Sequence, residues 1–175
     1  SRVGRGGELF DLLKFATMLR DSPNICTGSI TLKDDPRVLP TGKFLRKTKI
    51  NELPQLINIL KGDMSLIGPR PQTPRCFAAF PQESQLAIIK VRPGLSGIGS
   101  IVFRGEEDML DQAQDSEQFY DQVIMPYKGQ LEEWYVQNYS MKNYVLLMVL
   151  TALVVMLPSA RAHWRLLPNL PRPPA

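Results

Sequence analysis

The residues best suited to chemistry lie close together in the sequence, around a predicted helix start at Asn51 and Glu52. Backbone N–H groups at the start of a helix lack intrahelical partners and attract phosphate groups. Arg46 and Lys47 lie just upstream, and Arg70 is held between two prolines, so three cations could converge on one or two phosphates. Guanidinium groups contact phosphates through paired hydrogen bonds. These residues indicate phosphate chemistry, with structural ion pairs as the alternative for the two arginines.

The composition excludes several other kinds of site. The 175 residues include two cysteines, too few for a disulfide framework, and a single histidine in the C-terminal tail, His163. These residues cannot complete a zinc site of the usual spacing, and they disfavour a Ser-His-Asp or Cys-His mechanism. Any chemistry must therefore use carboxylates and basic residues, with or without a hard metal ion.

Charge is unevenly distributed along the chain. The net charge is +4, but residues 1–49 carry ten Lys/Arg against five Asp/Glu, and residues 105–133 carry nine Asp/Glu against one lysine. The basic segment 1–49 suits anionic partners such as nucleotides or an anionic lipid surface. A solvated basic face is the alternative. A role in binding DNA or RNA ranks third, because the sequence contains no nucleic-acid motif.

A helix that starts at Asn51 must position these groups. Asn is a favoured N-cap, and Gly62 is a natural C-terminal cap eleven residues later. Apolar residues at helical spacing predict a stripe that faces the core. They are Leu53, Leu56, Ile57 and Leu60. The segment 68–71 (GPRP) cannot be helical, so it is expected to form a rigid turn that holds Arg70.

Other segments are less distinctive. Residues 30–32 indicate a short strand, and residues 106–122 an acidic helix. In residues 144–157 only Thr151 is polar. As a helix this run would measure about 21 Å, which is shorter than the roughly 30 Å hydrocarbon core of a membrane. It is therefore expected to lie at a membrane interface or in the core. The Pro/Arg-rich tail, residues 158–175, is expected to be irregular.

Five segments carry a resemblance to a known family. They are KFATM (14–18), KDDPRV (33–38), GKFLRKTKINELPQLINILKGDMSLIGPRP (42–71), VRPGLSG (91–97) and YVQNYSMKNYVLL (135–147). Together they resemble the bacterial sugar transferases, the monotopic polyprenol-phosphate phosphoglycosyl transferases that start glycan assembly. The resemblance covers most of residues 1–157, and its central block is long and specific.

The resemblance implies a membrane-bound enzyme on the cytoplasmic face of a bacterial inner membrane. Family members transfer a sugar phosphate from a nucleotide diphosphate sugar, typically a UDP-sugar, to undecaprenyl phosphate, and they release UMP. This reaction initiates surface glycan synthesis, including that of exopolysaccharides, and Mg²⁺ assists it. Expected partners are therefore a UDP-sugar, undecaprenyl phosphate and an anionic membrane surface, but no nucleic acid; an oligomer is compatible with the sequence.

The expected fold is α+β: a compact, helix-dominated catalytic domain over residues 1–157 with a small β-sheet and a membrane-associated, apolar C-terminal helix. Residues 158–175 follow it as a tail. Family members begin with a hydrophobic re-entrant helix, and we expect this chain to start just after the place where that anchor would end.

The resemblance also assigns roles to the residues singled out above. Asn51 and Glu52 occupy the catalytic positions, and Glu52 is the expected Mg²⁺ ligand or nucleophile. Arg46, Arg70 and Lys14 are the expected phosphate-binding residues. Favourable pairing with the helix dipole is the alternative for Glu52, and a structural salt bridge is the alternative for Lys14. The expectation common to all of these roles is geometric: the side chains at 46, 51, 52 and 70 should meet in one pocket.

Two arginines lie near the VRPGLSG turn, Arg92 and Arg104. Either could reach a phosphate from this position. A surface role is the alternative for both.

The chain departs from the family pattern at Asn51, where the family usually has an aspartate that attacks the phosphate. An amide is neutral and cannot form an acyl phosphate. Three explanations are open: a subgroup in which Glu52 is the nucleophile or transfer is direct, an Asp→Asn change introduced to trap substrate, or an inactive relative. A smaller departure is Ala16, where the family often has arginine.

Two rival functions follow from the same residues. The first is a catalytically silent, membrane-associated relative that binds a nucleotide-sugar or a partner without turnover. The second is a basic peripheral protein that binds anionic lipid and has no chemistry.

Overall fold

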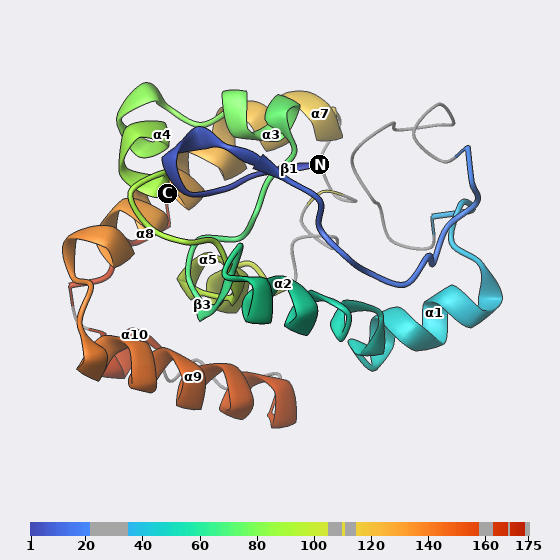
Figure 1. The fold of residues 1–175 in the computed structure, drawn as a ribbon. Helices are drawn as coiled ribbons and strands as arrows, with labels where there is room; N and C mark the ends of the chain where they lie inside the picture. The colour runs from blue at the N-terminus through green and yellow to red at the C-terminus, as the bar shows by residue number, and fades with distance from the viewer. Residues whose placement is uncertain (22–34, 105–109, 111–114, 158–162, 168, 174–175) are drawn as a thin grey trace.

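The computed structural model describes residues 1–21, 35–104, 110, 115–157, 163–167 and 169–173 (Figure 1). In chain order the elements are β1 (Arg2–Val3), η1 (Arg5–Gly7), β2 (Leu9–Phe10), α1 (Pro40–Lys47), η3 (Ile50–Glu52), α2 (Gln55–Lys61), β3 (Ser65–Ile67), α3 (Pro74–Ala78), α4 (Gln82–Ile88), β4 (Gly94–Ser96), α5 (Ile98–Val102), α7 (Ser116–Phe119), η4 (Tyr120–Ile124), α8 (Met125–Gln137), α9 (Met141–Met156) and α10 (His163–Leu166). Helices dominate, which agrees with the expected α+β class. The strand expected at residues 30–32 lies outside the described residues. Of the acidic helix expected at 106–122, residues 106–109 and 111–114 also lie outside them, and the described second half contains α7 and the start of η4.

The β-structure consists of two separate pairs of strands rather than one small sheet within the described part of the chain. β1 and β2 pair antiparallel, and β3 and β4 pair parallel with Ser65 opposite Gly94 and Ile67 opposite Ser96. The parallel pair matters most for the site, because the chain leaves β3 directly into the turn that contains Arg70.

The core is built around α8, which packs against α4 and α5. Its largest buried hydrophobic residues include Ile98, Met125, Leu131, Leu147 and Leu150. The tail also contributes to this core: His163 of α10 and the side chains of Leu167 and Leu170 are buried, whereas Leu166 is 51% exposed. The expectation of an irregular tail is wrong for residues 163–166, because they form α10; Leu167 and Leu170 pack on the core from outside any helix or strand.

The helix expected at Asn51 begins later than the sequence indicated. Asn51 lies inside the 3₁₀ turn η3 and is not an N-cap, and α2 starts at Gln55 after Pro54. The predicted end is confirmed, since Gly62 caps α2 in the left-handed conformation with φ of 87°.

The predicted orientation of α2 is wrong. Its apolar stripe is exposed, with Leu60 87% accessible, whereas the side chain of Asn58 is 1% accessible. Asn58 accepts a hydrogen bond from the backbone N–H of Leu13 (3.0 Å) and donates to the carbonyl of Asp11 (2.9 Å). The segment that contains Asp11 and Leu13 therefore lies along the polar side of α2, and its buried backbone groups need the Asn58 amide.

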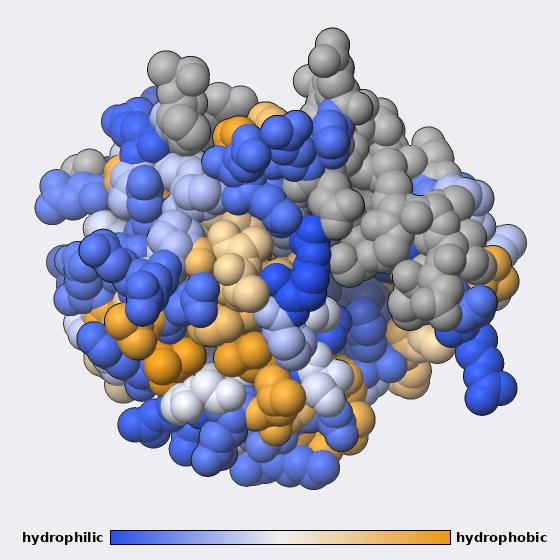
Figure 2. All heavy atoms as spheres, turned by 90° about the horizontal axis from the view of Figure 1, so that it is seen from above, coloured by the Kyte–Doolittle hydropathy of each residue, from blue (hydrophilic) through white to orange (hydrophobic). Residues whose placement is uncertain are grey.

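The helix α9 has a similar unpartnered apolar side. Leu147, Leu150 and Val154 are buried, but Val149 and Val155 are more than half exposed. Both α2 and α9 lie in the lower half of Figure 1. The view from above in Figure 2 shows hydrophilic residues over most of the described surface, with apolar residues in smaller groups between them. None of the helices in the described ranges is long and apolar enough to span a membrane.

A buried carboxylate lies beneath the β3–β4 pair. Glu132 in α8 is 3% exposed, and its Oε2 atom has no hydrogen-bond partner among the described residues. Burial raises the pKa of Glu132 to about 8, although Lys128 one turn earlier and the nearby backbone N–H groups of Arg70 and Gly99 oppose the shift. The carboxyl group thus lies close to the backbone of the Arg70 turn.

We expect the raised pKa of Glu132 to make stability depend on pH. Because the folded-state pKa of about 8 lies above the ordinary 4.5, folding favours the protonated carboxyl group, and the free energy of unfolding should fall as pH rises through this range. The Glu132→Gln variant should lack this part of the slope. Urea unfolding of both proteins at several pH values measures the difference. The exposed Glu83→Gln serves as the control, and a Glu132→Gln slope equal to that of wild type would contradict the assignment.

Candidate active site

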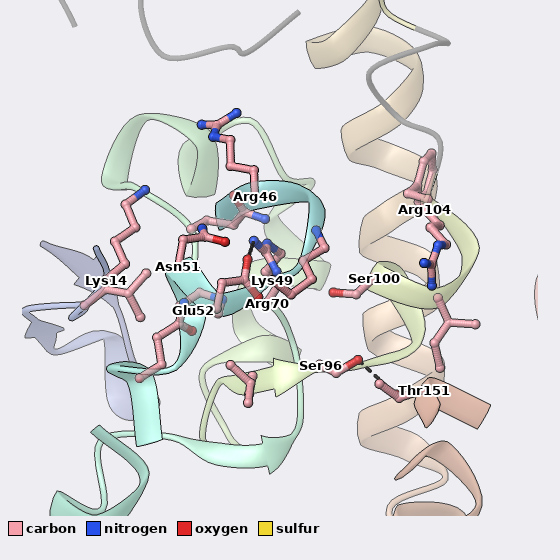
Figure 3. Close-up of a pocket in the computed structure, with 18 of the residues that line it drawn as sticks. Lys14, Arg46, Lys49, Asn51, Glu52, Arg70, Ser96, Ser100, Arg104 and Thr151 are labelled. Carbon is pink, nitrogen blue, oxygen red and sulfur yellow. Dashed lines mark hydrogen bonds and ion pairs between the residues drawn. The ribbon is translucent and has the colours of Figure 1, made fainter. Parts of the chain in front are cut away.

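The predicted site residues line one cleft of about 990 Å³ (Figure 3). Lys14 comes from the segment after β2, Arg46 from α1, Asn51 and Glu52 from η3, and Arg70 from the turn after β3. The side chains at 46, 51, 52 and 70 thus share a single cavity, as the sequence predicted. Their chemical roles stay predictions.

Glu52 and Arg70 form the closest charged contact in this part of the cleft. The Nη2 atom of Arg70 lies 3.0 Å from the Oε1 atom of Glu52. The Glu52 side chain is 17% exposed and the Arg70 side chain 44%. A partly exposed ion pair contributes little net free energy, typically ~0–1 kcal/mol. An incoming phosphate could therefore replace Glu52 as the partner of Arg70 at small cost.

Asn51 presents an unsatisfied oxygen beside Glu52. Its side chain is 9% exposed, and Oδ1 has no hydrogen-bond partner among the described residues. Its backbone carbonyl accepts a hydrogen bond from the N–H of Phe15 (3.0 Å), which holds the neighbouring Lys14 at the cleft. Because buried oxygens of this kind normally have a partner, Asn51 Oδ1 is a natural place for a cation or a hydrogen-bond donor from a ligand.

Lys49 was missed by the sequence analysis. It lines the cleft and adopts φ of 60° and ψ of 9°, and among the described residues other than glycine it alone has a positive φ. Non-glycine residues in this conformation are uncommon and concentrate at functional sites. The turn at Lys49 joins α1 to η3 and so orients Asn51 and Glu52. Its position in the basic run before Asn51 was a signal that could have identified it.

Arg2 was also missed, and it reaches the cleft from β1. The backbone N–H of Val3 donates to the carbonyl of Gln72 (3.0 Å), which brings β1 to the segment after Arg70. No local pattern in the sequence links Arg2 to Arg70, because the hydrogen bond between Val3 and Gln72 that brings their segments together forms only in the folded chain.

Arg46 is held in a different direction from Arg70. Its Nε donates to Thr17 Oγ1 (3.1 Å), and its Nη2 contacts the sulfur of Met18 (3.6 Å). Gly42 in α1 makes this possible, because a Cβ atom there would lie 2.1 Å from the carbonyl oxygen of Thr17. In Figure 3 the Arg46 side chain extends away from the Glu52–Arg70 pair. Arg46 therefore belongs to the rim of the cleft.

The electrostatics of the cleft favour an anion. Partial burial, followed by the charges of Arg2, Arg46 and Arg70, lowers the pKa of Lys14, and Glu52 only partly compensates. A lysine whose pKa is lowered by neighbouring cations gains free energy when an anion binds among them.

The residues present also fit a magnesium ion bound together with a phosphate. The described residues contain no group of three or more His, Cys, Asp or Glu that could hold a metal alone. Glu52 and the unpartnered Oδ1 of Asn51 are nevertheless adjacent oxygen donors. Mg²⁺ is commonly held by one or two protein oxygens, substrate phosphates and water.

Comparison with known proteins identifies relatives over most of the chain. The model of the family described as bacterial sugar transferase matches residues 1–158. The chain is 32% identical over 169 residues to the undecaprenyl-phosphate galactose phosphotransferase of Salmonella typhimurium, which covers 89% of this chain and 32% of that protein. It is 34% identical over 167 residues to the galactosyl transferase CpsE of Streptococcus agalactiae, covering 90% and 34%.

A third relative has a higher identity over a shorter segment. The UDP-N-acetylgalactosamine-undecaprenyl-phosphate N-acetylgalactosaminephosphotransferase of Aeromonas hydrophila is 43% identical over 105 residues, covering 58% of this chain and 24% of that protein. The chain thus spans about a third of the length of the first two relatives. Since the family match extends over residues 1–158, which include every residue of the site described above, the chain belongs to the bacterial sugar transferase family.

Proposed function

We propose that this chain transfers a sugar phosphate from a UDP-sugar to undecaprenyl phosphate, at the cytoplasmic face of the bacterial inner membrane, as the first step of a surface glycan. The observation that carries the proposal is the cleft in which Glu52 lies 3.0 Å from Arg70 among further cations. The printed names of the relatives support it, because they describe phosphotransferases of galactose and N-acetylgalactosamine that act on undecaprenyl phosphate.

The reaction exchanges one phosphorus–oxygen bond for another. A bond forms between the phosphorus that carries the sugar and an oxygen of the acceptor phosphate, and the bond from that phosphorus to UMP breaks. UMP leaves with the bridging oxygen and its electron pair. The protein has mainly to position the reactants and neutralise charge in such a transfer. Arg70 and Lys14 supply that charge beside Glu52, and Arg46 supplies it from the rim.

Arg70 also controls Glu52 in this scheme. Without substrate its guanidinium binds the Glu52 carboxylate. When the donor diphosphate enters, Arg70 turns to it with paired hydrogen bonds, because the two negative charges of the diphosphate attract the guanidinium more strongly than the single charge of a carboxylate does. Glu52 is then released toward the reacting phosphorus.

If the sugar phosphate is carried on the protein, Glu52 is the group that carries it. Two carboxylates of described residues line the cleft, and the other, Asp35, is buried and paired with Arg37 at 2.6 Å. A Glu52 oxygen would bond to phosphorus as UMP leaves, and the acceptor phosphate would then displace it. Asn51 cannot serve as this nucleophile because it is an amide.

Magnesium fits this site as a cofactor held by Glu52, the Oδ1 atom of Asn51 and the donor phosphates. When bound it supplies positive charge to the phosphate oxygens. Asn51 contributes a neutral oxygen here, so it retains a role in positioning even though it cannot attack.

A silent relative that binds the nucleotide-sugar without turnover is the second candidate. The specific observation in its favour is Asn51 itself, because the amide replaces the carboxylate usual in the family. Both candidates require UDP-sugar binding, and only the first requires UMP release.

The exposed apolar sides of α2 and α9 support attachment to a membrane surface. Leu60 on α2 and Met156 on α9 are 87% and 79% exposed, and the cations of residues 1–49 add attraction for anionic lipid. Helices with such apolar faces lie in the interface, with the apolar residues at the boundary of headgroups and acyl chains. The C-terminal helix α9 would thus lie on the membrane.

The catalytic proposal is tested by UMP release. With a UDP-sugar, Mg²⁺ and undecaprenyl phosphate in mixed micelles, the chain should release UMP. Glu52→Gln should lower the rate by about a hundredfold or more, because among the described residues that line the cleft it removes the one carboxylate not buried against Arg37. The exposed Glu83→Gln is the matched control.

The variant Asn51→Asp separates the two candidates in the same assay. Restoring the carboxylate should increase the rate of a working enzyme several-fold. No release by the chain with any UDP-sugar, together with release by Asn51→Asp, would establish the silent relative instead.

Membrane attachment is tested by sedimentation with vesicles of phosphatidylethanolamine and phosphatidylglycerol. The double variant Leu56→Gln, Leu60→Gln should lose most of its vesicle-bound fraction, because both side chains are exposed on the apolar side of α2. Leu86→Gln on α4 is the matched control, since Leu86 is 55% exposed on a different helix. Equal losses in both proteins would reject α2 as the contact surface.

A further inference from the structure

The cleft continues beyond the Glu52–Arg70 pair into a second end between α5 and α9, and no step above uses it. This end is lined by Ser96 of β4, Ser100 of α5, Arg104 after α5, and Thr151 and Val155 of α9. Ser96 and Thr151 contact each other through their hydroxyl groups (2.9 Å), which joins β4 to α9 at the floor of this end (Figure 3).

Two polar groups of the second end are available to a ligand. The Oγ atom of Ser100 is buried and has no hydrogen-bond partner among the residues that the structure describes. In Figure 3 the Ser100 side chain points across the cleft toward Lys49 and Arg70. Arg104 donates from Nη1 to the carbonyl of Val154, a carbonyl in the last turn of α9 that lacks an intrahelical partner. A guanidinium has five N–H donors, so Arg104 keeps others for an anion.

The second end opens onto an apolar surface. Val154 and Val155 both line the cleft; Val154 is 4% exposed and Val155 55%. Met156 and Leu157, which follow along the chain, are 79% and 56% exposed. An anion held near Ser100 and Arg104 would therefore have an aliphatic path beside it, which leads to the outer side of α9.

The aromatic residues of this end are poorly placed to stack on a nucleobase. Phe103 and Tyr120 are buried, and the Lys128 ammonium lies 5.2 Å and 5.7 Å from the centres of their rings. Because the Lys128 ammonium already lies over the faces of both rings, a ligand at this end would contact the aliphatic residues of α9 instead. The chemistry that fits is a phosphomonoester attached to a hydrocarbon chain.

The size of the cleft is compatible with two reactants. Pockets for one small ligand measure about 300–1,000 Å³, and this cleft of about 990 Å³ lies at the upper end of that range. Transfer between two phosphates requires both to reach each other in one cavity. Glu52 and Arg70 line this cavity together with Ser100 and Arg104, and the Ser100 side chain is directed toward Arg70, so phosphates bound by the two groups of residues can meet between them (Figure 3).

We propose that the second end binds the polyprenyl phosphate acceptor, with Ser100 and Arg104 contacting its phosphate and Val154 and Val155 contacting its first isoprene units. This inference rests on the proposed function, because that function supplies a lipid phosphate as the acceptor. It adds the residues that recognise this acceptor and separates them from those that bind the donor.

The test measures two dissociation constants on the full chain by calorimetry, one for farnesyl phosphate and one for UDP with Mg²⁺. Arg104→Gln should weaken the binding of farnesyl phosphate about tenfold, a change that corresponds to loss of one charged contact. The affinity for UDP should change less than about twofold. Arg92→Gln is the matched control: Arg92 is also exposed and lies directly before β4, but it does not line the cleft.

A second variant guards against a purely structural effect, because Arg104→Gln also removes the contact with the Val154 carbonyl. Ser100→Asp leaves that contact in place and adds a negative charge where the acceptor phosphate would lie. Ser100→Asp should lower the affinity for farnesyl phosphate more than Ser100→Ala does, and it should leave the affinity for UDP unchanged. Farnesol, which lacks the phosphate, should bind equally to wild type and to Ser100→Asp.

The outcomes separate this inference from the proposed function. If UDP binds but Arg104→Gln and Ser100→Asp leave the affinity for farnesyl phosphate unchanged, or if Arg92→Gln weakens it equally, the inference is overturned and the proposed function stands. If Arg104→Gln and Ser100→Asp weaken the binding of UDP but leave the affinity for farnesyl phosphate unchanged, the second end binds the donor instead. If wild type binds neither ligand, the proposed function fails and the inference fails with it.

Discussion

The site depends on a close contact between two backbone segments, the turn after β3 and the strand β4. A Cβ atom at Gly94 would lie 2.1 Å from the backbone nitrogen of Gly68, and one at Gly97 would lie 2.1 Å from the Gly68 carbonyl oxygen. Glycine is required at these positions because real Cβ atoms do not approach so closely. The contact is reinforced by hydrogen bonds from Gly68 N–H to the carbonyl of Ser96 (2.9 Å) and from Gly94 N–H to the carbonyl of Pro69 (2.8 Å). Both prolines that flank Arg70 are buried, and the Arg70 side chain extends into the cleft to Glu52 (3.0 Å).

The helix α8 supports this contact between the turn and β4. Polar side chains of α8 are buried against the two segments. The hydroxyl of Tyr135 donates to the Ile67 carbonyl (3.1 Å), and the Glu132 carboxyl group lies near the Arg70 and Gly99 backbone. The Tyr135 contact joins α8 to the end of β3, directly before the arginine turn. Across the cleft, Glu52 of η3 pairs with Arg70 of that turn.

The family and several residues that line the cleft could be predicted from the sequence, whereas the packing of the elements could not. Arg70 between two prolines and Gly62 at a helix end are local features, and each is present as expected. The apolar stripe of α2 was assigned to the wrong environment, because periodicity shows that one side of a helix is apolar but not what it contacts. The left-handed backbone of Lys49 and the burial of Glu132 both arise in the folded chain. Neither property can be read from the residue type alone. Strands of two or three residues are likewise too short to give an alternating pattern.

We expect the glycine contact to act on ligand binding through Arg70. A double-mutant cycle of Gly97→Ala and Arg70→Gln, measured as UDP affinity with Mg²⁺ at a temperature where circular dichroism shows all four proteins folded, tests this coupling. Gly97→Ala should weaken UDP binding in the wild-type background and have no further effect once Arg70 is replaced. Equal weakening in both backgrounds would show that the glycine contact does not act through Arg70.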